Sequence, residues 1–127
     1  MKIGKECIAF HFDDVKEARE HMDLEIIQDF GSFAYGHALY CWDDGHRYLA
    51  RCRRCGGYVL VQSSEFHGAI DDDYYTDYFP VCGLDEADKL NRLYSGFAIE
   101  ASFEKRYLMM TNLRLHWSQE KNSDDLG

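Results

Sequence analysis

The chain has 127 residues, and its 23 acidic and 14 basic side chains give a net charge of −9. Such an acidic chain argues against nonspecific nucleic-acid binding, which needs a basic face. No apolar run approaches membrane-spanning length, and residues 1–6 predict neither a signal peptide nor an anchor. We therefore expect a cytoplasmic protein that binds neither nucleic acid nor membranes directly.

Length and composition predict one domain over residues 1–127. Hydrophobic residues make up 46% of the chain and aromatic residues 15%, which is enough for a packed core. The polar tail, residues 118–127, is expected to lie outside that core.

The N-terminal third predicts two strands around a helix. Residues 3–12 mix apolar and polar side chains and could form a first strand. Asp14 followed by Glu17 matches a capping box, which predicts a helix of about two turns ending near Met22. Residues 24–30 suit a strand better than an extension of that helix.

The middle third predicts an antiparallel meander. Residues 32–42 are rich in aromatics, and Asp44-Gly45 is a strong signal for a two-residue hairpin loop. Residues 46–51 then return, and residues 58–62 form the next strand. Residues 63–73 are polar and turn-prone, and residues 74–79 predict a strand that ends at Pro80.

The C-terminal third predicts a second helix over residues 85–94, between Gly83 and Gly96, with acidic residues in its first turn. Residues 97–103 predict a strand, and residues 107–117 a strand or a helix. Together these patterns predict an α+β fold, a mainly antiparallel sheet with two short helices and a zinc-knuckle hairpin.

The most informative motif is Cys52-Arg53-Arg54-Cys55 followed by two glycines. Two thiolates at this spacing can bind one tetrahedral ion, and a glycine after the second cysteine permits positive φ in a tight turn. The two arginines favour thiolate over thiol. Residues 56–61 predict a strand and not a helix, so we favour a zinc site over thioredoxin-like redox chemistry.

A tetrahedral site needs two more ligands. In the predicted hairpin, cross-strand partners have numbers that sum to 89, which places His37 opposite Cys52, about 5 Å away. Cys41 would lie roughly 13 Å from Cys52 unless a bulge intervened. We expect His37 as the third ligand and Cys82, on a turn-like segment, as the fourth. The other candidates are Cys7, Cys41, His46, His67 and His116, of which His67 and Cys41 are the main rivals.

The sequence favours a structural zinc and no enzymatic activity. Catalytic zinc keeps an open coordination position. Zinc deaminases need a His-x-Glu upstream of Pro-Cys-x-x-Cys, whereas Glu65 and His67 follow Cys52 in reversed order. No zinc-protease, phosphate-loop or hydrolase motif is present. We therefore assign no catalytic residues.

Residues 71–88 contain seven acidic side chains and no lysine or arginine. A solvated acidic loop leading into an edge strand would explain them. Alternatively, tyrosines supply rigid contact area, and neighbouring carboxylates would steer a basic protein partner. The candidate partner-binding residues are Asp71, Asp72, Asp73, Tyr74, Tyr75, Asp77 and Tyr78.

The knuckle of Cys52 and Cys55 resembles that of zinc-ribbon proteins. With its acidic 71–88 segment, its size and its lack of catalytic motifs, the chain resembles the small, acidic, zinc-containing anti-CRISPR proteins of phages that act on type II-A Cas9. This resemblance implies an inhibitor that binds Cas9 and blocks its loading of DNA. The alternative is a zinc-stabilised immunity or adaptor protein with another protein partner.

Overall fold

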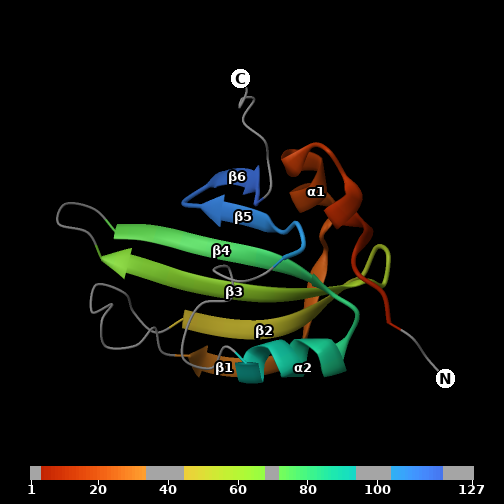
Figure 1. The fold of residues 1–127 in the computed structure, drawn as a ribbon. Coiled ribbons are helices and arrows are strands. Elements are labelled where there is room, and N and C mark those ends of the chain that lie inside the picture. The colour runs from red at the N-terminus through yellow and green to blue at the C-terminus, as the bar shows by residue number, and fades with distance from the viewer. Residues whose placement is uncertain (1–3, 34–44, 68–71, 94–103, 119–127) are drawn as a thin grey trace.

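The computed structural model describes residues 4–33, 45–67, 72–93 and 104–118. They form one six-stranded sheet with strand order β1-β2-β3-β4-β5-β6, and every neighbouring pair is antiparallel. Figure 1 shows this sheet with its helices. The predicted α+β fold with a mainly antiparallel sheet and two helices is confirmed. The elements in chain order are η1 (Ile8–His11), α1 (Val15–His21), β1 (Leu24–Phe33), β2 (Gly45–Cys52), β3 (Tyr58–His67), β4 (Asp72–Val81), α2 (Leu84–Leu93), β5 (Leu108–Thr111) and β6 (Arg114–Trp117).

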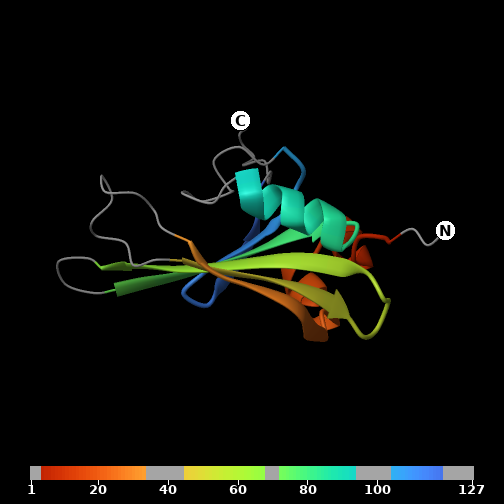
Figure 2. The same cartoon turned by 90° about the horizontal axis from the view of Figure 1, so that it is seen from below.

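The two helices lie on opposite faces of the sheet (Figure 2). On the face of η1 and α1, Phe10, Ala18 and Met22 are buried with Val59, Val61, Tyr78 and Trp117 of the strands. On the other face, Ala87 of α2 is buried with Leu49, Leu60 and Phe79. Side chains alternate between the faces along each strand, so each central strand contributes to both cores.

Helix α1 begins as the sequence predicts. The carboxylate of Asp14 accepts a hydrogen bond from the backbone N–H of Lys16 at 2.8 Å. This bond satisfies one of the N–H groups that lack an intrahelical partner. Ala18 is fully buried against the sheet. In the part of the chain that the structure describes, no helix is long and apolar enough to cross a membrane.

The predicted two-residue hairpin at Asp44-Gly45 is wrong. Strand β2 pairs with β1 from Leu24↔Cys52 at one end to Phe33↔Gly45 at the other. Residues 34–44 therefore connect the two strands, and Leu24 stands opposite Cys52 where the sequence placed His37. His37 itself lies outside the described residues, as do Cys41 and the predicted strand at 97–103.

Three other segments differ from their predictions. Residues 4–12, the described part of the strand predicted at 3–12, contain a single parallel bridge, Glu6↔Tyr58, followed by η1, instead of a strand. Strand β3 continues to His67 and β4 begins at Asp72, so most of the polar 63–73 segment belongs to a long hairpin. Pro80 lies inside β4, where its missing N–H is tolerated because β5 pairs only with Tyr75–Tyr78.

The ambiguous segment 107–117 is a β-hairpin. Strands β5 and β6 pair from Leu108↔Trp117 to Thr111↔Arg114. The intervening turn places Asn112 at φ 58°, the left-handed region that asparagine tolerates better than most residues.

Candidate metal centre

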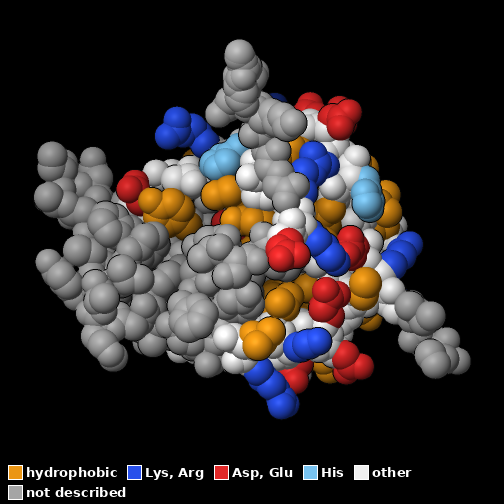
Figure 3. All heavy atoms as spheres, viewed as in Figure 1, with side chains coloured by type: hydrophobic (Ala, Val, Ile, Leu, Met, Phe, Trp, Pro, Cys, Tyr) orange, Lys and Arg blue, Asp and Glu red, His pale blue; other side chains and the backbone are white. Residues whose placement is uncertain are grey.

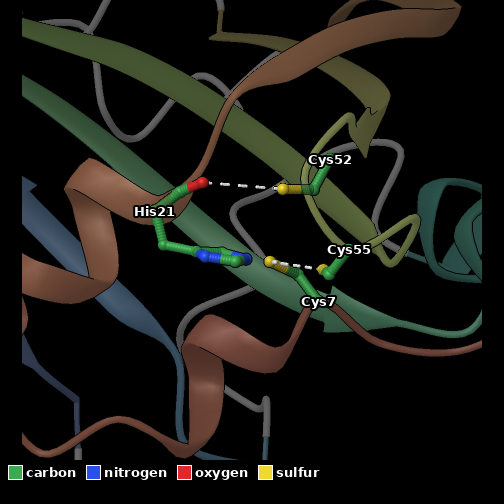
Figure 4. A group of neighbouring side chains, drawn as sticks. All are labelled: Cys7, His21, Cys52 and Cys55. Atoms are coloured by element: carbon green, nitrogen blue, oxygen red, sulfur yellow. Dashed lines mark hydrogen bonds between the residues drawn. The ribbon is translucent and has the colours of Figure 1, made fainter.

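Four potential metal ligands from three separate parts of the chain meet at one end of the sheet. Cys7 precedes η1, His21 ends α1, Cys52 ends β2, and Cys55 lies in the turn between β2 and β3. The nearest ligand atoms of the four side chains all lie within 4.8 Å of one another. Figure 4 shows the His21 ring pointing toward the sulfurs from the side opposite the knuckle.

The knuckle turn is fixed by its own backbone. The N–H of Gly56 donates to the carbonyl of Cys52 at 2.7 Å, and the N–H of Cys52 donates to the carbonyl of Gly57 at 2.7 Å. Gly56 has φ 77°, as the sequence predicts for the residue after the second cysteine. The turn thus holds Cys52 and Cys55 on one side.

Cys7 reaches the knuckle through backbone pairing with the start of β3. The N–H of Tyr58 donates to the carbonyl of Lys5 at 2.8 Å, and the N–H of Cys7 donates to the carbonyl of Tyr58 at 3.3 Å. This bridge brings the N-terminal segment against Gly57. It places a third sulfur beside the Cys-x-x-Cys pair.

His21 reaches the same place through the register of β1 and β2. Leu24 pairs with Cys52, and the N–H of Arg53 donates to the carbonyl of Asp23 at 2.8 Å. His21 stands three residues before Leu24, at the end of α1. Its Nε2 is buried and has no hydrogen-bond partner among the described residues. A buried polar atom without a hydrogen-bond partner lowers the stability of the fold. A metal ion bound to Nε2 would supply the missing partner.

The spacing of the sulfurs matches tetrahedral coordination. The Sγ atoms of Cys7 and Cys55 lie 3.7 Å apart. A regular tetrahedron with metal–sulfur bonds of about 2.3 Å separates its sulfurs by about 3.8 Å. Three sulfurs and one imidazole nitrogen complete the four positions of such a site, so the residues fit a metal ion.

The environments of the cysteines differ. Burial raises the pKa of the Cys7 thiol far above its ordinary value, and the neighbouring Cys52 and Cys55 add to that rise. Burial also acts to raise the pKa of Cys52, but backbone hydrogen bonds at Asp23, Cys55 and Arg54 outweigh it, and the net shift is downward. In Figure 4 the Cys52 thiol donates to the carbonyl of His21 at 3.6 Å. Cys52 therefore ionises more readily than Cys7, which needs a cation beside it.

The structure brings together two of the four ligands expected from the sequence. Cys52 and Cys55 belong to the cluster, whereas Cys82 does not. Cys82 is exposed before α2, and its backbone N–H donates to the carboxylate of Glu86 at 2.7 Å. Of the other candidates, His46 pairs with Asp29 at 2.8 Å and His116 lies on β6, while the side chain of the rival His67 lies outside the described residues.

Cys7 was among the sequence candidates, but His21 was not. The predicted hairpin placed His37 beside Cys52 instead. Had residues 24–30 been paired with β2, the end of the preceding helix would have fallen beside the knuckle, and His21 is the last residue of that helix. The strand pairing is therefore the signal that could have found this ligand.

The candidate partner-binding residues, between positions 71 and 78, are divided between the surface and the core of the protein. Tyr74 is 54% exposed, whereas Asp77 and Tyr78 are each 4% exposed. Tyr78 accepts a hydrogen bond from Arg19 at 3.1 Å beneath α1. Asp77 and Tyr78 are thus core residues and are removed from the predicted partner-binding surface. Tyr75 and Asp73 are half-buried, while Asp71 and the side chain of Asp72 lie outside the described residues.

Asp77 belongs to a buried polar network on the α2 face. Arg47 donates to Gln62 at 2.9 Å, and Gln62 donates to Asp77 at 3.5 Å. Arg47 also donates to Asn91 of α2 at 3.3 Å. Both Arg47 and Gln62 are fully buried. Arg47 of β2 therefore lies in the same network as Asp77, although segment 71–88 itself contains no lysine or arginine.

Comparison with known proteins found no match among protein-family models, curated proteins or solved structures. The class of the protein therefore follows from its fold and site alone. It is an α+β protein with a Cys3His cluster compatible with a metal ion.

Proposed function

We propose that the chain is a zinc-stabilised protein-binding module in which the metal is structural. The observation that carries this proposal is the orphaned, buried Nε2 of His21 facing three cysteine sulfurs. Three thiolates and an imidazole in a tetrahedral arrangement are typical of structural zinc. With four protein ligands, no coordination position is left for a substrate or a reactive water.

The position of the centre supports a structural role. Its ligands come from the N-terminal segment, the end of α1 and the knuckle, so one ion would tie the whole η1–α1 layer to the sheet. A metal-free fold would have to retain that layer through packing and hydrogen bonds alone. Zinc supplies about 10 kcal/mol or more of folding free energy in small zinc domains.

The partner-binding surface that we propose is the start of β4. Exposed Tyr74 stands opposite Glu65 in the β3–β4 pairing. Asp72 and Asp73 precede it. Figure 3 shows acidic and basic side chains interspersed over the described part of one face. The proposal therefore rests on this acidic, tyrosine-bearing strand end and not on a uniformly acidic face. A basic protein would be its natural partner.

The resemblance to zinc-containing anti-CRISPR proteins makes Cas9 the first partner to test. Purified, zinc-loaded protein should bind immobilised type II-A Cas9 and compete with its target DNA. Affinity should fall as salt rises, because the attraction is electrostatic. Absence of binding at low salt would exclude Cas9 and leave an adaptor with another basic partner as the function to pursue.

A further inference from the structure

The cluster lies beside a pocket that one of its three cysteines lines. A pocket of about 660 Å³ lies between the knuckle turn and the first turn of α2, and Cys55, Cys82 and Leu84 contribute to its walls. Cys7 and Cys52 are fully buried, whereas Cys55 is only partly buried. Of the three cysteines of the cluster, Cys55 is therefore the one that lines a pocket and is not fully buried.

The sulfur of Cys55 also has a close neighbour of its own kind. Its Sγ lies 3.7 Å from the Sγ of Cys7, and a disulfide needs about 2.05 Å. Cys55 lies in the turn between β2 and β3, so disulfide formation requires a rotation of its side chain or a shift of this turn. Cys52, by contrast, is directed at the carbonyl of His21.

We propose that Cys55 is an oxidation site through which a hydroperoxide converts Cys7 and Cys55 into a disulfide and expels the metal. This inference rests on the proposed zinc centre. It assigns a different chemistry to each sulfur: Cys55 meets the oxidant, Cys7 resolves the product, and Cys52 takes no part.

The two steps balance as follows. The Cys55 thiolate attacks one oxygen of hydrogen peroxide, the O–O bond breaks, and a sulfenic acid and hydroxide form. The Cys7 thiolate then attacks the Cys55 sulfur, the S–O bond breaks, and a disulfide and a second hydroxide form. Two electrons pass from sulfur to peroxide. The centre keeps only His21 and Cys52 as ligands, so its affinity for the metal falls and the η1–α1 layer loses its tether.

The test uses the full chain loaded with zinc and treated with hydrogen peroxide. A chromogenic chelator follows zinc release, and peptide mass spectrometry locates the disulfide. We expect one zinc released for each Cys7–Cys55 disulfide formed. Cys82→Ser is the matched control, because it removes the other thiol of the pocket and should leave both readouts unchanged.

Two ligand exchanges separate the roles of the sulfurs. Cys55→His keeps four ligands but removes the reachable sulfur, so peroxide should release its zinc at least about tenfold more slowly than in the wild type. Cys52→His keeps Cys7 and Cys55 and should release zinc at a rate near that of the wild type. If either exchange fails to hold zinc, the disulfide map of the wild type decides.

These outcomes test the oxidation site at Cys55 separately from the proposed zinc centre. Protein that carries no zinc before oxidation contradicts the proposed zinc centre. Zinc-loaded protein that resists peroxide, or that forms a Cys52–Cys55 or Cys55–Cys82 disulfide instead, overturns the assignment of Cys55 and Cys7 and leaves the zinc centre intact.

Discussion

Cys7 and Gly57 lie so close together that no side chain fits at position 57. A Cβ added to Gly57 would lie 2.4 Å from both the Cα and the backbone N of Cys7. These are main-chain atoms, held by the pairing of Lys5 and Cys7 with Tyr58, so they cannot move aside as a flexible side chain would. Glycine at position 57 therefore allows Cys7, the third sulfur ligand, to lie beside the knuckle.

Gly57→Ala should both lower stability and weaken metal binding. The added methyl group would push the N-terminal segment away from β3, and overpacking of this kind costs about 1–3 kcal/mol. Calorimetry should show a lower melting temperature, and zinc competition a weaker affinity. The control is Gly31→Ala, which has φ 82° and open space around its Cβ. It should cost about 1–2 kcal/mol through backbone strain without changing zinc affinity. Equal zinc affinity in the two variants would argue against this role of Gly57.

Metal affinity should rise with pH. Burial raises the pKa of Cys7 well above its ordinary value of 9.0, so this thiol is protonated in the metal-free protein at neutral pH. A metal must displace that proton. Metal affinity should therefore rise about tenfold for each increase of one pH unit and for each proton displaced. Titrations between pH 6 and 8, in buffers of different ionisation enthalpy, measure both the affinity and the protons released. Affinity independent of pH would mean that Cys7 is not a ligand.

In the metal-free protein, the same raised pKa makes stability fall as pH rises, whereas metal affinity increases with pH. The folded state favours the protonated Cys7 thiol, which contributes stability below pH 9. That contribution is lost as pH rises above 9. Chelator-treated protein should therefore unfold at lower denaturant concentration at pH 10 than at pH 8, and Cys7→Ser should reduce this difference.

Asp77 should matter for stability and not for binding. Its carboxylate lies in the buried network with Gln62 and Arg47, so Asp77→Ala removes a charged acceptor from this buried network. The expected loss is about 2–4 kcal/mol in free energy of unfolding. Asp85→Ala, at an exposed position in the first turn of α2, should cost less than about 1 kcal/mol. Similar denaturation midpoints for the two variants would show that the network contributes little.

The start of β4 should control association with a basic partner. Changing Asp72 and Asp73 to Asn should slow the on-rate of Cas9 binding in surface plasmon resonance and reduce its salt dependence. Tyr74→Ala should instead raise the off-rate if the exposed ring is an anchor. Leu93→Ala, an exposed position on α2, serves as the control. Full-strength, salt-insensitive binding by the double Asn variant would exclude this strand end from the interface.

Local signals in the sequence predicted much of the fold. Asp14 caps α1 as its capping pattern indicates, and the helix after Gly83 and the strand from residue 24 are present. Each of these depends on residues within a few positions of one another. The knuckle is local too, and the positive φ of Gly56 follows from its motif.

The errors arose where distant segments meet. Asp44-Gly45 is a strong hairpin pattern, but β1 and β2 are joined by the longer segment 34–44, and β1 shifts register twice along the pair. No local pattern encodes that register. His21 and Cys7 join Cys52 only through it and through the Glu6–Tyr58 bridge. Likewise, Tyr74 and Tyr78 lie on the same face of β4, yet Tyr74 is exposed and Tyr78 buried, so packing against other elements and not the composition of the segment decides burial.

The zinc content of purified protein tests the central claim most directly. Protein prepared without chelator should carry one zinc per chain by elemental analysis and native mass spectrometry. Cys7→Ser and His21→Ala should each lose it, whereas Cys82→Ser and His46→Ala, which change residues outside the cluster, should retain it. Wild-type protein without zinc, or full zinc occupancy in both Cys7→Ser and His21→Ala, would contradict the proposed Cys3His centre.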